Sequence, residues 1–227
     1  DAKGYLQAEN DEDRSGILYC YDLTGNVTQI RRPVSQTSDG QTKYRLNTYR
    51  YDLMGCCIEE KRYLEEQSEV SAEGRVNVIH YTYDQASRLT SVTDSTGAHM
   101  EYAYDGRNLR TMERYKIAEG IYQERHYTYS ASGRLIKIME SADEKGCGRK
   151  YVPTQISYDG NGNITRIQTP SGNEILREYD QSNHLLAETH KEKGGSIQNR
   201  ITFTYDLNGN LTQRMESNGF YTRYQYD

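Results

Sequence analysis

The sequence has no tryptophan and only two phenylalanines and three prolines among its 227 residues. Leucine, isoleucine, valine and phenylalanine together make up 16% of the chain, a low share for a domain with a dry apolar core. Tyrosine supplies the missing apolar surface, because 22 residues are tyrosine. A tyrosine can bury its ring and still keep its hydroxyl in contact with water. The composition therefore favours a thin, two-faced sheet over ordinary globular packing.

Long apolar runs and an excess of one charge are also missing. No apolar run approaches the ~20 residues that a membrane helix needs, so we expect no membrane span. The 28 basic and 33 acidic residues are interspersed, which argues against a nucleic-acid partner because such proteins carry a basic stripe. No signal peptide is recognisable, and the start at Asp1 suggests a piece of a longer chain.

The dominant signal is a repeated Tyr-Asp dipeptide. It occurs at Tyr21-Asp22, Tyr51-Asp52, Tyr83-Asp84, Tyr104-Asp105, Tyr158-Asp159, Tyr179-Asp180, Tyr205-Asp206 and Tyr226-Asp227, with Tyr129-Ser130 as a degenerate copy. The shortest spacing is 21 residues and appears three times, which indicates the basic repeat unit. We therefore predict a single array over residues 1–227, with about eight repeats starting near residues 21, 51, 83, 104, 129, 158, 179 and 205.

Each repeat has the pattern of a β-hairpin. An aromatic residue usually precedes the motif Tyr by two positions, a spacing typical of strands, and a β-rich run follows the motif. Between the two strands the Asp can accept hydrogen bonds from amides two or three residues on. A glycine can take the left-handed conformation that ends such a turn with a bulge. The glycines in this place are Gly25, Gly55, Gly133, Gly162 and Gly209.

A second, looser turn precedes the next aromatic pair in each repeat. It contains Gly40, Gly74, Gly97, Gly120, Gly172 or Gly219, and the length differences between repeats fall there. The segment from the motif to the following Leu keeps its length except at Tyr104–Leu109, which reads as one residue shorter. Leu89 and Val92 are three residues apart, so either both faces of the sheet are partly covered or a bulge realigns them.

Two turns per repeat predict an all-β fold, a long twisted antiparallel meander of hairpins. Each strand pair adds a right-handed rotation of about 20–25°, so we expect the sheet to curve into an arc or partial spiral. Unpaired edges would favour edge-to-edge self-association at high concentration.

The repeated Tyr-Asp, Gly-Asn and Leu-Thr elements resemble the YD-repeat or Rhs-repeat family, found in bacterial Rhs and wall-associated proteins, insecticidal toxin-complex shells and teneurins. The resemblance runs from about Tyr19 to Asp227. It implies a strip of hairpins that winds into a hollow shell, together with secretion or display on a bacterial surface. The Asp-Pro-rich segment that usually closes such shells is missing, so the resemblance implies an interior stretch of a longer array. The implied partners are the remaining repeats and terminal domains of the parent chain.

The ladder of motif aspartates offers two interpretations. Two carboxyls about 5–9.5 Å apart in a cleft could hydrolyse a glycosidic bond, but turn capping explains every Asp without a substrate and is favoured. The runs 159–163 and 206–210 begin like calcium loops, yet Ile164 and Leu211 stand where the loop needs glycine. We therefore predict no catalytic residues, no metal site and no cofactor.

Four cysteines and three Asn-x-Thr sequences are interpreted as structural. Cys20, Cys56, Cys57 and Cys147 form no metal-ligand spacing; Cys57 stands where other repeats carry Leu or Val, and one long-range disulfide remains an alternative. Asn26, Asn163 and Asn210 match the glycosylation pattern because the repeat happens to spell it.

The tyrosine ladder leaves two functions open. Buried, the rings hold a thin sheet together by cross-strand pairing, which we favour. Exposed, they could bind cell-surface glycan or a partner. The leading hypothesis is a non-catalytic wall segment of a shell or scaffold that encloses a toxin or effector domain. The alternative is an adhesion module that uses the Tyr-rich face or the rim loops.

Overall fold

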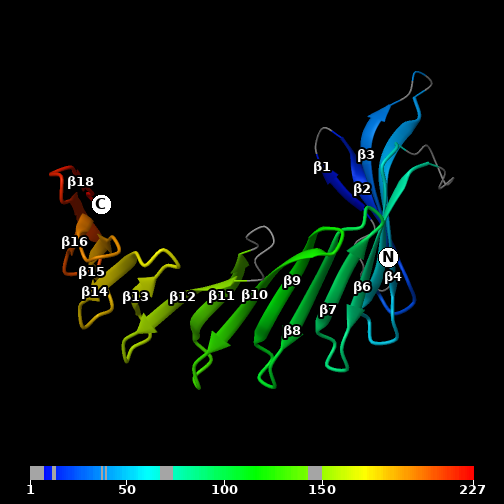
Figure 1. The fold of residues 1–227 in the computed structure, drawn as a ribbon. Helices are drawn as coiled ribbons and strands as arrows, with labels where there is room; N and C mark the ends of the chain where they lie inside the picture. The colour runs from blue at the N-terminus through cyan, green and yellow to red at the C-terminus, as the bar shows by residue number, and fades with distance from the viewer. Residues whose placement is uncertain (1–7, 12–13, 37, 39, 67–73, 143–149) are drawn as a thin grey trace. The chain divides into compact units, whose positions relative to one another are not determined.

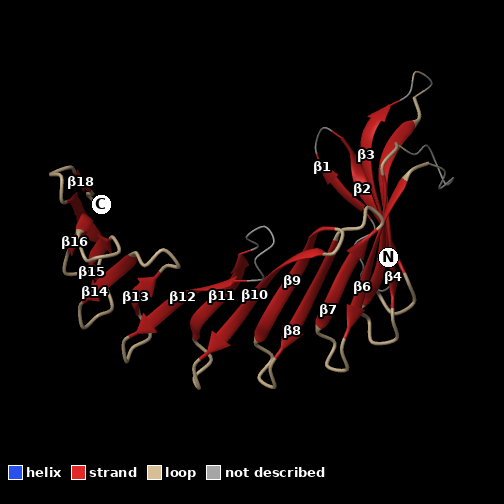
Figure 2. Ribbon diagram, in the orientation of Figure 1, coloured by secondary structure: helices blue, strands red, loops and turns tan. Residues whose placement is uncertain are grey.

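A computed structural model describes residues 8–11, 14–36, 38, 40–66, 74–142 and 150–227. Within these residues the chain forms eighteen β-strands and no helix (Figures 1 and 2). The strands are β1 (Ala8–Asp11), β2 (Arg14–Tyr21), β3 (Val27–Gln36), β4 (Thr42–Tyr51), β5 (Cys57–Tyr63), β6 (Val76–Tyr83), β7 (Leu89–Asp94), β8 (His99–Tyr104), β9 (Arg110–Ala118), β10 (Ile121–Tyr129), β11 (Leu135–Ala142), β12 (Lys150–Tyr158), β13 (Ile164–Gln168), β14 (Glu174–Tyr179), β15 (Leu185–Lys191), β16 (Ile197–Tyr205), β17 (Leu211–Glu216) and β18 (Tyr221–Arg223).

Consecutive strands pair with one another. The chain divides into two compact units, residues 1–103 with 113–122 and residues 104–112 with 123–227. In the first unit, β1 to β8 pair antiparallel in sequence order. In the second unit, β10 to β18 do the same. The predicted all-β antiparallel meander is confirmed, and its curvature into an arc stays a prediction.

A β-bulge follows the turns that start at Tyr21, Tyr51, Tyr83, Tyr129, Tyr158, Tyr179 and Tyr205. The motif Tyr pairs with the residue six positions later, and the register shifts beside it, as for Tyr51 with Cys57 and Tyr83 with Leu89. Because Tyr81 pairs with Val92 while Tyr83 pairs with Leu89, the bulge brings Leu89 and Val92 to one face of the sheet. Of the two alternatives for this pair, the realigning bulge is the one that the structure shows.

The turn after Tyr104 is not shortened, which corrects the sequence interpretation. Asp105 donates its amide to the Leu109 carbonyl at 2.9 Å, as Asp22 does to the Asn26 carbonyl at 2.9 Å. Leu109 therefore occupies the place of Asn26, inside the turn, and does not open the next strand. Alignment on the Leu was misleading because the turn hydrogen bonds, not the apolar residue, define the register.

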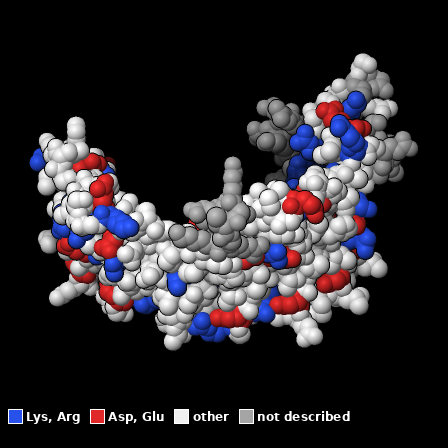
Figure 3. All heavy atoms as spheres, viewed as in Figure 1, with Lys and Arg blue, Asp and Glu red and all other residues white. Residues whose placement is uncertain are grey.

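The core is thin. The described residues include four buried apolar side chains, Leu46, Ile79, Ala187 and Ile201, and no large side chain that is fully buried. On the face seen in Figure 3, basic and acidic side chains lie interspersed. Half-buried tyrosine rings and hydrogen bonds therefore carry much of the cohesion that an apolar core supplies in a globular domain.

Candidate functional site

The repeated Tyr-Asp turns are the most regular feature of the molecule. We call each a YD turn and number its positions from the motif Tyr, so that Tyr21 is position 1, Asp22 position 2, Gly25 position 5, Asn26 position 6 and Val27 position 7. Position 5 donates its amide to the position 2 carbonyl, and position 2 donates its own amide to the position 6 carbonyl. These two bonds recur in the turns that start at Tyr21, Tyr51, Tyr83, Tyr104, Tyr129, Tyr158, Tyr179 and Tyr205.

The position 2 carboxylate closes each turn from inside. The Asp22 Oδ1 atom accepts the amides of Thr24 and Asn26, each at 2.9 Å. Six further aspartates each accept two backbone amides on Oδ1, namely Asp52, Asp84, Asp105, Asp159, Asp180 and Asp206. The first amide lies two residues on, or three for Asp159, which agrees with the sequence interpretation, but the second amide lies four residues on. In the degenerate turn Ser130 Oγ accepts the Arg134 amide at 3.1 Å instead.

In six of these turns the hydrogen bonds lower the pKa of the aspartate, namely Asp22, Asp84, Asp105, Asp159, Asp180 and Asp206. The Thr24 hydroxyl is the main cause that lowers the pKa of Asp22. The Arg88 amide does the same for the pKa of Asp84, and the Asn210 side chain for the pKa of Asp206. A carboxylate that accepts several N–H bonds is a poor proton donor at neutral pH. The Asp ladder therefore has the chemistry of turn acceptors.

Position 5 lies in the left-handed region of backbone conformation. Gly25 and Gly162 have φ values of 94° and 99° there. In three turns a residue with a side chain takes the same conformation, Ser87 at 59°, Asn108 at 64° and Asn183 at 67°. Asparagine tolerates this conformation and serine does so at a cost, so Ser87 is the strained member of the series.

The motif Tyr fastens each hairpin to the preceding one. The Tyr51 hydroxyl donates to the carbonyl of Val27, position 7 of the turn before, at 2.8 Å. We call this contact the tyrosine clamp. It recurs between the same two positions at 2.8–3.1 Å for Tyr83 and Cys57, Tyr129 and Arg110, Tyr158 and Leu135, Tyr179 and Ile164, Tyr205 and Leu185, and Tyr226 and Leu211. Burial raises the pKa of Tyr51, Tyr83 and Tyr205, which keeps these donors protonated.

Side chains at positions 4 and 6 reach from one YD turn to the next. Asn163 Nδ2 donates to Asn183 Oδ1 at 2.7 Å, and the His184 ring stacks on Tyr205 at 4.7 Å. Arg134 lies 5.7 Å from the centre of the Tyr158 ring, and its Nη1 atom is 3.4 Å from the Asp159 carbonyl. Successive turns are thus bridged by whichever long polar side chain the repeat provides.

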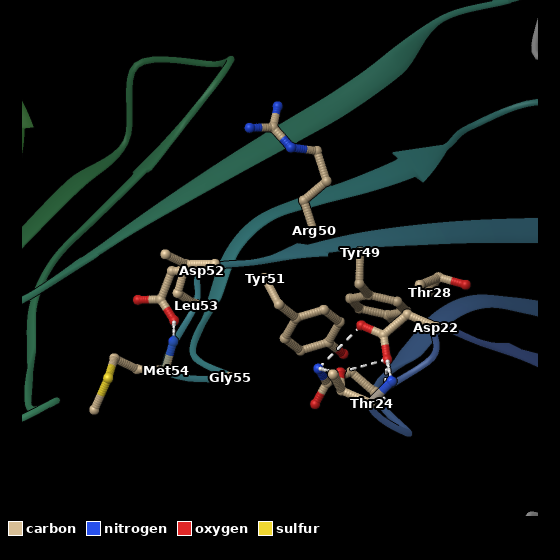
Figure 4. A pocket seen from close by; sticks show the side chains of 11 residues that line it. Asp22, Thr24, Thr28, Tyr49, Arg50, Tyr51, Asp52, Leu53, Met54 and Gly55 are labelled. Carbon is tan, nitrogen blue, oxygen red and sulfur yellow. Dashed lines mark hydrogen bonds between the residues drawn. The ribbon is translucent and has the colours of Figure 1, made fainter.

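An open groove lies between two of the successive turns. It has a volume of about 540 Å³ between turns 21–26 and 51–56 and is lined by Asp22, Thr24, Asn26, Thr28 and residues 49–55. Figure 4 shows the rings of Tyr49 and Tyr51 pointing toward Asp22 and Thr24, while Arg50 points away.

A buried carboxylate was missed by the sequence reasoning. Glu60 lies in β5, is 7% exposed and pairs with Tyr49 of β4. In two other hairpins the residue that pairs with the equivalent Tyr is Ile30 or Val92. The Glu60 carboxylate accepts from Arg62 Nε at 2.7 Å and from the Tyr81 hydroxyl at 2.9 Å. The Arg62 hydrogen bond lowers the pKa of Glu60, while burial, followed by the hydrogen bond to Glu60, raises the pKa of Tyr81 to about 12. The sequence did contain a sign of this site, because a charged residue stands at a repeat position where other repeats carry isoleucine or valine.

The described cysteines form no disulfide with one another. Cys20, Cys56 and Cys57 are free thiols, and Cys147 lies outside the described residues. In the part of the chain that the structure describes, no three His, Cys, Asp or Glu side chains are grouped to hold a metal, and no helix could cross a membrane. The side chains of the three asparagines in the Asn-x-Thr sequences, Asn26, Asn163 and Asn210, donate from Nδ2 to Oδ2 of the Asp in their own turn at 2.9–3.0 Å.

The sequence model of the teneurin YD-shell family matches residues 60–187. The chain belongs to the teneurin YD-shell family. The matched region contains the YD turns that start at Tyr83, Tyr104, Tyr129, Tyr158 and Tyr179, so the family signature coincides with the turns described above. The resemblance inferred from the Tyr-Asp repeat is confirmed. No curated protein matches the sequence.

Several solved structures are similar to this YD-shell chain. A crystal structure of TcdB2-TccC3 shares 14% identity at a TM-score of 0.48, and the match covers 97% of this chain and 16% of that one. The TcdB2-TccC3-TEV structure shares 14% identity at a TM-score of 0.47, and the match covers 95% of this chain and 16% of that one. The Tc holotoxin pore of Photorhabdus luminescens shares 14% identity at a TM-score of 0.45, and the match covers 97% of this chain and 16% of that one. The YD-shell chain thus spans about one sixth of these structures' chains.

Proposed function

We propose that this chain is a non-catalytic length of wall in a larger YD-repeat protein. The observation that carries the proposal is the tyrosine clamp, which joins a motif Tyr to the YD turn before it in seven places among the described residues. A wall needs this kind of serial connection, because each repeat must hold its neighbour without a central core.

The chemistry of the aspartates supports a structural role. Asp180 Oδ1 accepts the backbone amides of Ser182 and His184, both at 2.8 Å and both within its own turn. The same is true of Asp105, which accepts from Arg107 and Leu109. A general acid must hold a proton at working pH, whereas these bonds favour the ionised form. The proposed wall needs no cofactor.

The complete protein is proposed to be secreted or displayed on a bacterial surface. Its array would form a shell or scaffold around a toxin or effector domain, and this chain would meet the other repeats of the same polypeptide. Membership of a family named for its YD shell supports this proposal.

Limited proteolysis of the complete native polypeptide tests the wall. After cleavage, gel filtration and mass spectrometry show which pieces stay together. We expect a cleaved terminal piece to co-elute with the repeats, because a shell would retain it. If every piece separates and the repeats remain as an open strip, the wall proposal fails, and binding of a glycan or a partner protein becomes the leading function.

A further inference from the structure

Two arginines of this chain show how a guanidinium group fits between successive YD turns. Arg107, at position 4 of its turn, donates from Nη1 to the carbonyls of Ser130 at 2.8 Å and Ala131 at 3.2 Å, positions 2 and 3 of the next turn. Arg134, at position 6, lies over the Tyr158 ring and reaches the Asp159 carbonyl, again position 2 of the next turn. Arginines at two different positions thus bring a guanidinium to the position 2 carbonyl of the next turn.

The groove between turns 21–26 and 51–56 has these acceptors but no such donor. Its positions 4 and 6 are Thr24 and Asn26, which are short, and both donate to the Asp22 carboxylate of their own turn. Among the described residues, the Asp52 carbonyl receives the Gly55 amide at 3.1 Å and the Leu53 carbonyl receives no donor. The Ser130 and Asp159 carbonyls also accept a position 5 amide, so that bond leaves room for a guanidinium.

We propose that this groove binds an arginine side chain from another polypeptide segment. The guanidinium lies against the Tyr51 ring, as Arg134 does against Tyr158, and donates to the Asp52 and Leu53 carbonyls, as Arg107 does to Ser130 and Ala131. The Asp22 carboxylate, which also lines the groove, contributes the opposite charge. Arginine suits this place better than lysine, because its planar fork stacks on an aromatic ring and bonds two acceptors at once.

The rim of the groove indicates what flanks the arginine. Leu53 and Met54 project from the tip of the second turn, Leu53 fully exposed and Met54 77% exposed. An apolar neighbour of the bound arginine would cover these side chains and bury their surface. The expected ligand is therefore an extended segment in which leucine or a similar residue follows the arginine.

Titration of the 227-residue chain with acetyl-Gly-Arg-Leu-Gly-amide, followed by calorimetry and NMR, tests the site. We expect one saturable site, with at least about tenfold weaker binding when lysine replaces arginine. The uncharged citrulline peptide should bind more weakly still. Equal binding of the arginine and citrulline peptides would overturn the proposal. Because the chain is titrated alone, the result is independent of the wall function.

Variants locate the site within the fold. In Thr24→Arg the new side chain should occupy the groove as Arg107 occupies its own, abolish peptide binding and raise the melting temperature. Ser182→Arg is the matched control, because Ser182 is also an exposed residue at position 4 of its turn. The space between that turn and the turn that starts at Tyr205 is already occupied by His184, which stacks on Tyr205. The control variant should bind the peptide as the parent chain does. Undiminished binding by folded Thr24→Arg would refute the assignment.

Removal of an internal arginine provides a second measurement. Arg107→Thr leaves the Ser130 and Ala131 carbonyls without their guanidinium donor. The number of bound peptides per chain should rise from one to two. This result would support the proposal even if Thr24→Arg failed to fold, and an unchanged single site in Arg107→Thr would contradict it.

Discussion

The hydroxyl of Tyr158 donates a 2.8 Å hydrogen bond to the carbonyl of Leu135, which lies one repeat earlier on the neighbouring hairpin. The ring is half-buried and the bond crosses between two YD turns, so it adds a side-chain contact between repeats whose strands β11 and β12 are already paired through their backbones. The same pair of positions meets wherever a tyrosine clamp is seen.

Removal of one clamp hydroxyl should weaken the array. Tyr158→Phe keeps the ring but leaves the Leu135 carbonyl without this donor, so we expect a loss of about 1 kcal/mol in the free energy of unfolding. Urea denaturation followed by circular dichroism measures the loss. Tyr221→Phe is the control, because Tyr221 is 61% exposed, and it should change stability by less than about 0.5 kcal/mol. Equal effects of the two variants would show that the clamp contributes nothing.

Ser87 should be improved by glycine. Its φ of 59° is strained for a residue with a Cβ, and most other YD turns have glycine at this position. Ser87→Gly should therefore stabilise the chain by about 0.5–1 kcal/mol. Ser182→Gly, in a turn position outside the left-handed region, should instead destabilise it. A loss of stability in both variants, measured by thermal unfolding, would contradict the assigned strain.

Acid should unfold the array through its turn aspartates. The pKa values of Asp84, Asp159, Asp180 and Asp206 are lowered in the folded chain by hydrogen bonds to the carboxylates. A group with a lowered folded pKa stabilises the fold above its unfolded pKa of about 4, and this contribution is lost as the pH falls through the folded pKa. The melting temperature should be flat near neutral pH and drop steeply below about pH 4. A melting temperature that stays constant down to about pH 2 would contradict this role.

Alkali should act through Tyr81. Its pKa is raised to about 12, by burial first and then by the hydrogen bond to Glu60. A raised folded pKa stabilises the fold below the unfolded pKa of about 10, and this contribution is lost as the pH rises through about 12. Glu60→Gln removes the neighbouring charge and should move the Tyr81 titration toward its ordinary range. NMR of the Tyr81 ring against pH measures the shift, and an unchanged titration in Glu60→Gln would show that burial alone sets it.

The sequence predicted the strands and turns because both follow from local chemistry. A spacing of two between aromatic residues indicates strands, and Asp and Gly at fixed offsets indicate the turn. The tyrosine clamp could not be found in this way, since its partners lie 24 residues apart for Tyr51 and Val27 but 15 apart for Tyr179 and Ile164. No constant spacing marks a contact that crosses hairpins of unequal length. Leu109 was wrongly taken as the start of a strand for a related reason. The repeats were aligned on their apolar residues, whereas the backbone hydrogen bonds of the turn set the register.

The clamp also separates two properties of the chain that are linked in most folds. It fixes the step from one repeat to the next at the rim of the YD turns, while strand length varies independently: β13 has five residues and β3 has ten. Hairpins of different reach can therefore be exchanged, duplicated or lengthened at the opposite rim without a change in the step between neighbours. Such a chain can diversify in its loops over evolution and keep the same repeat spacing.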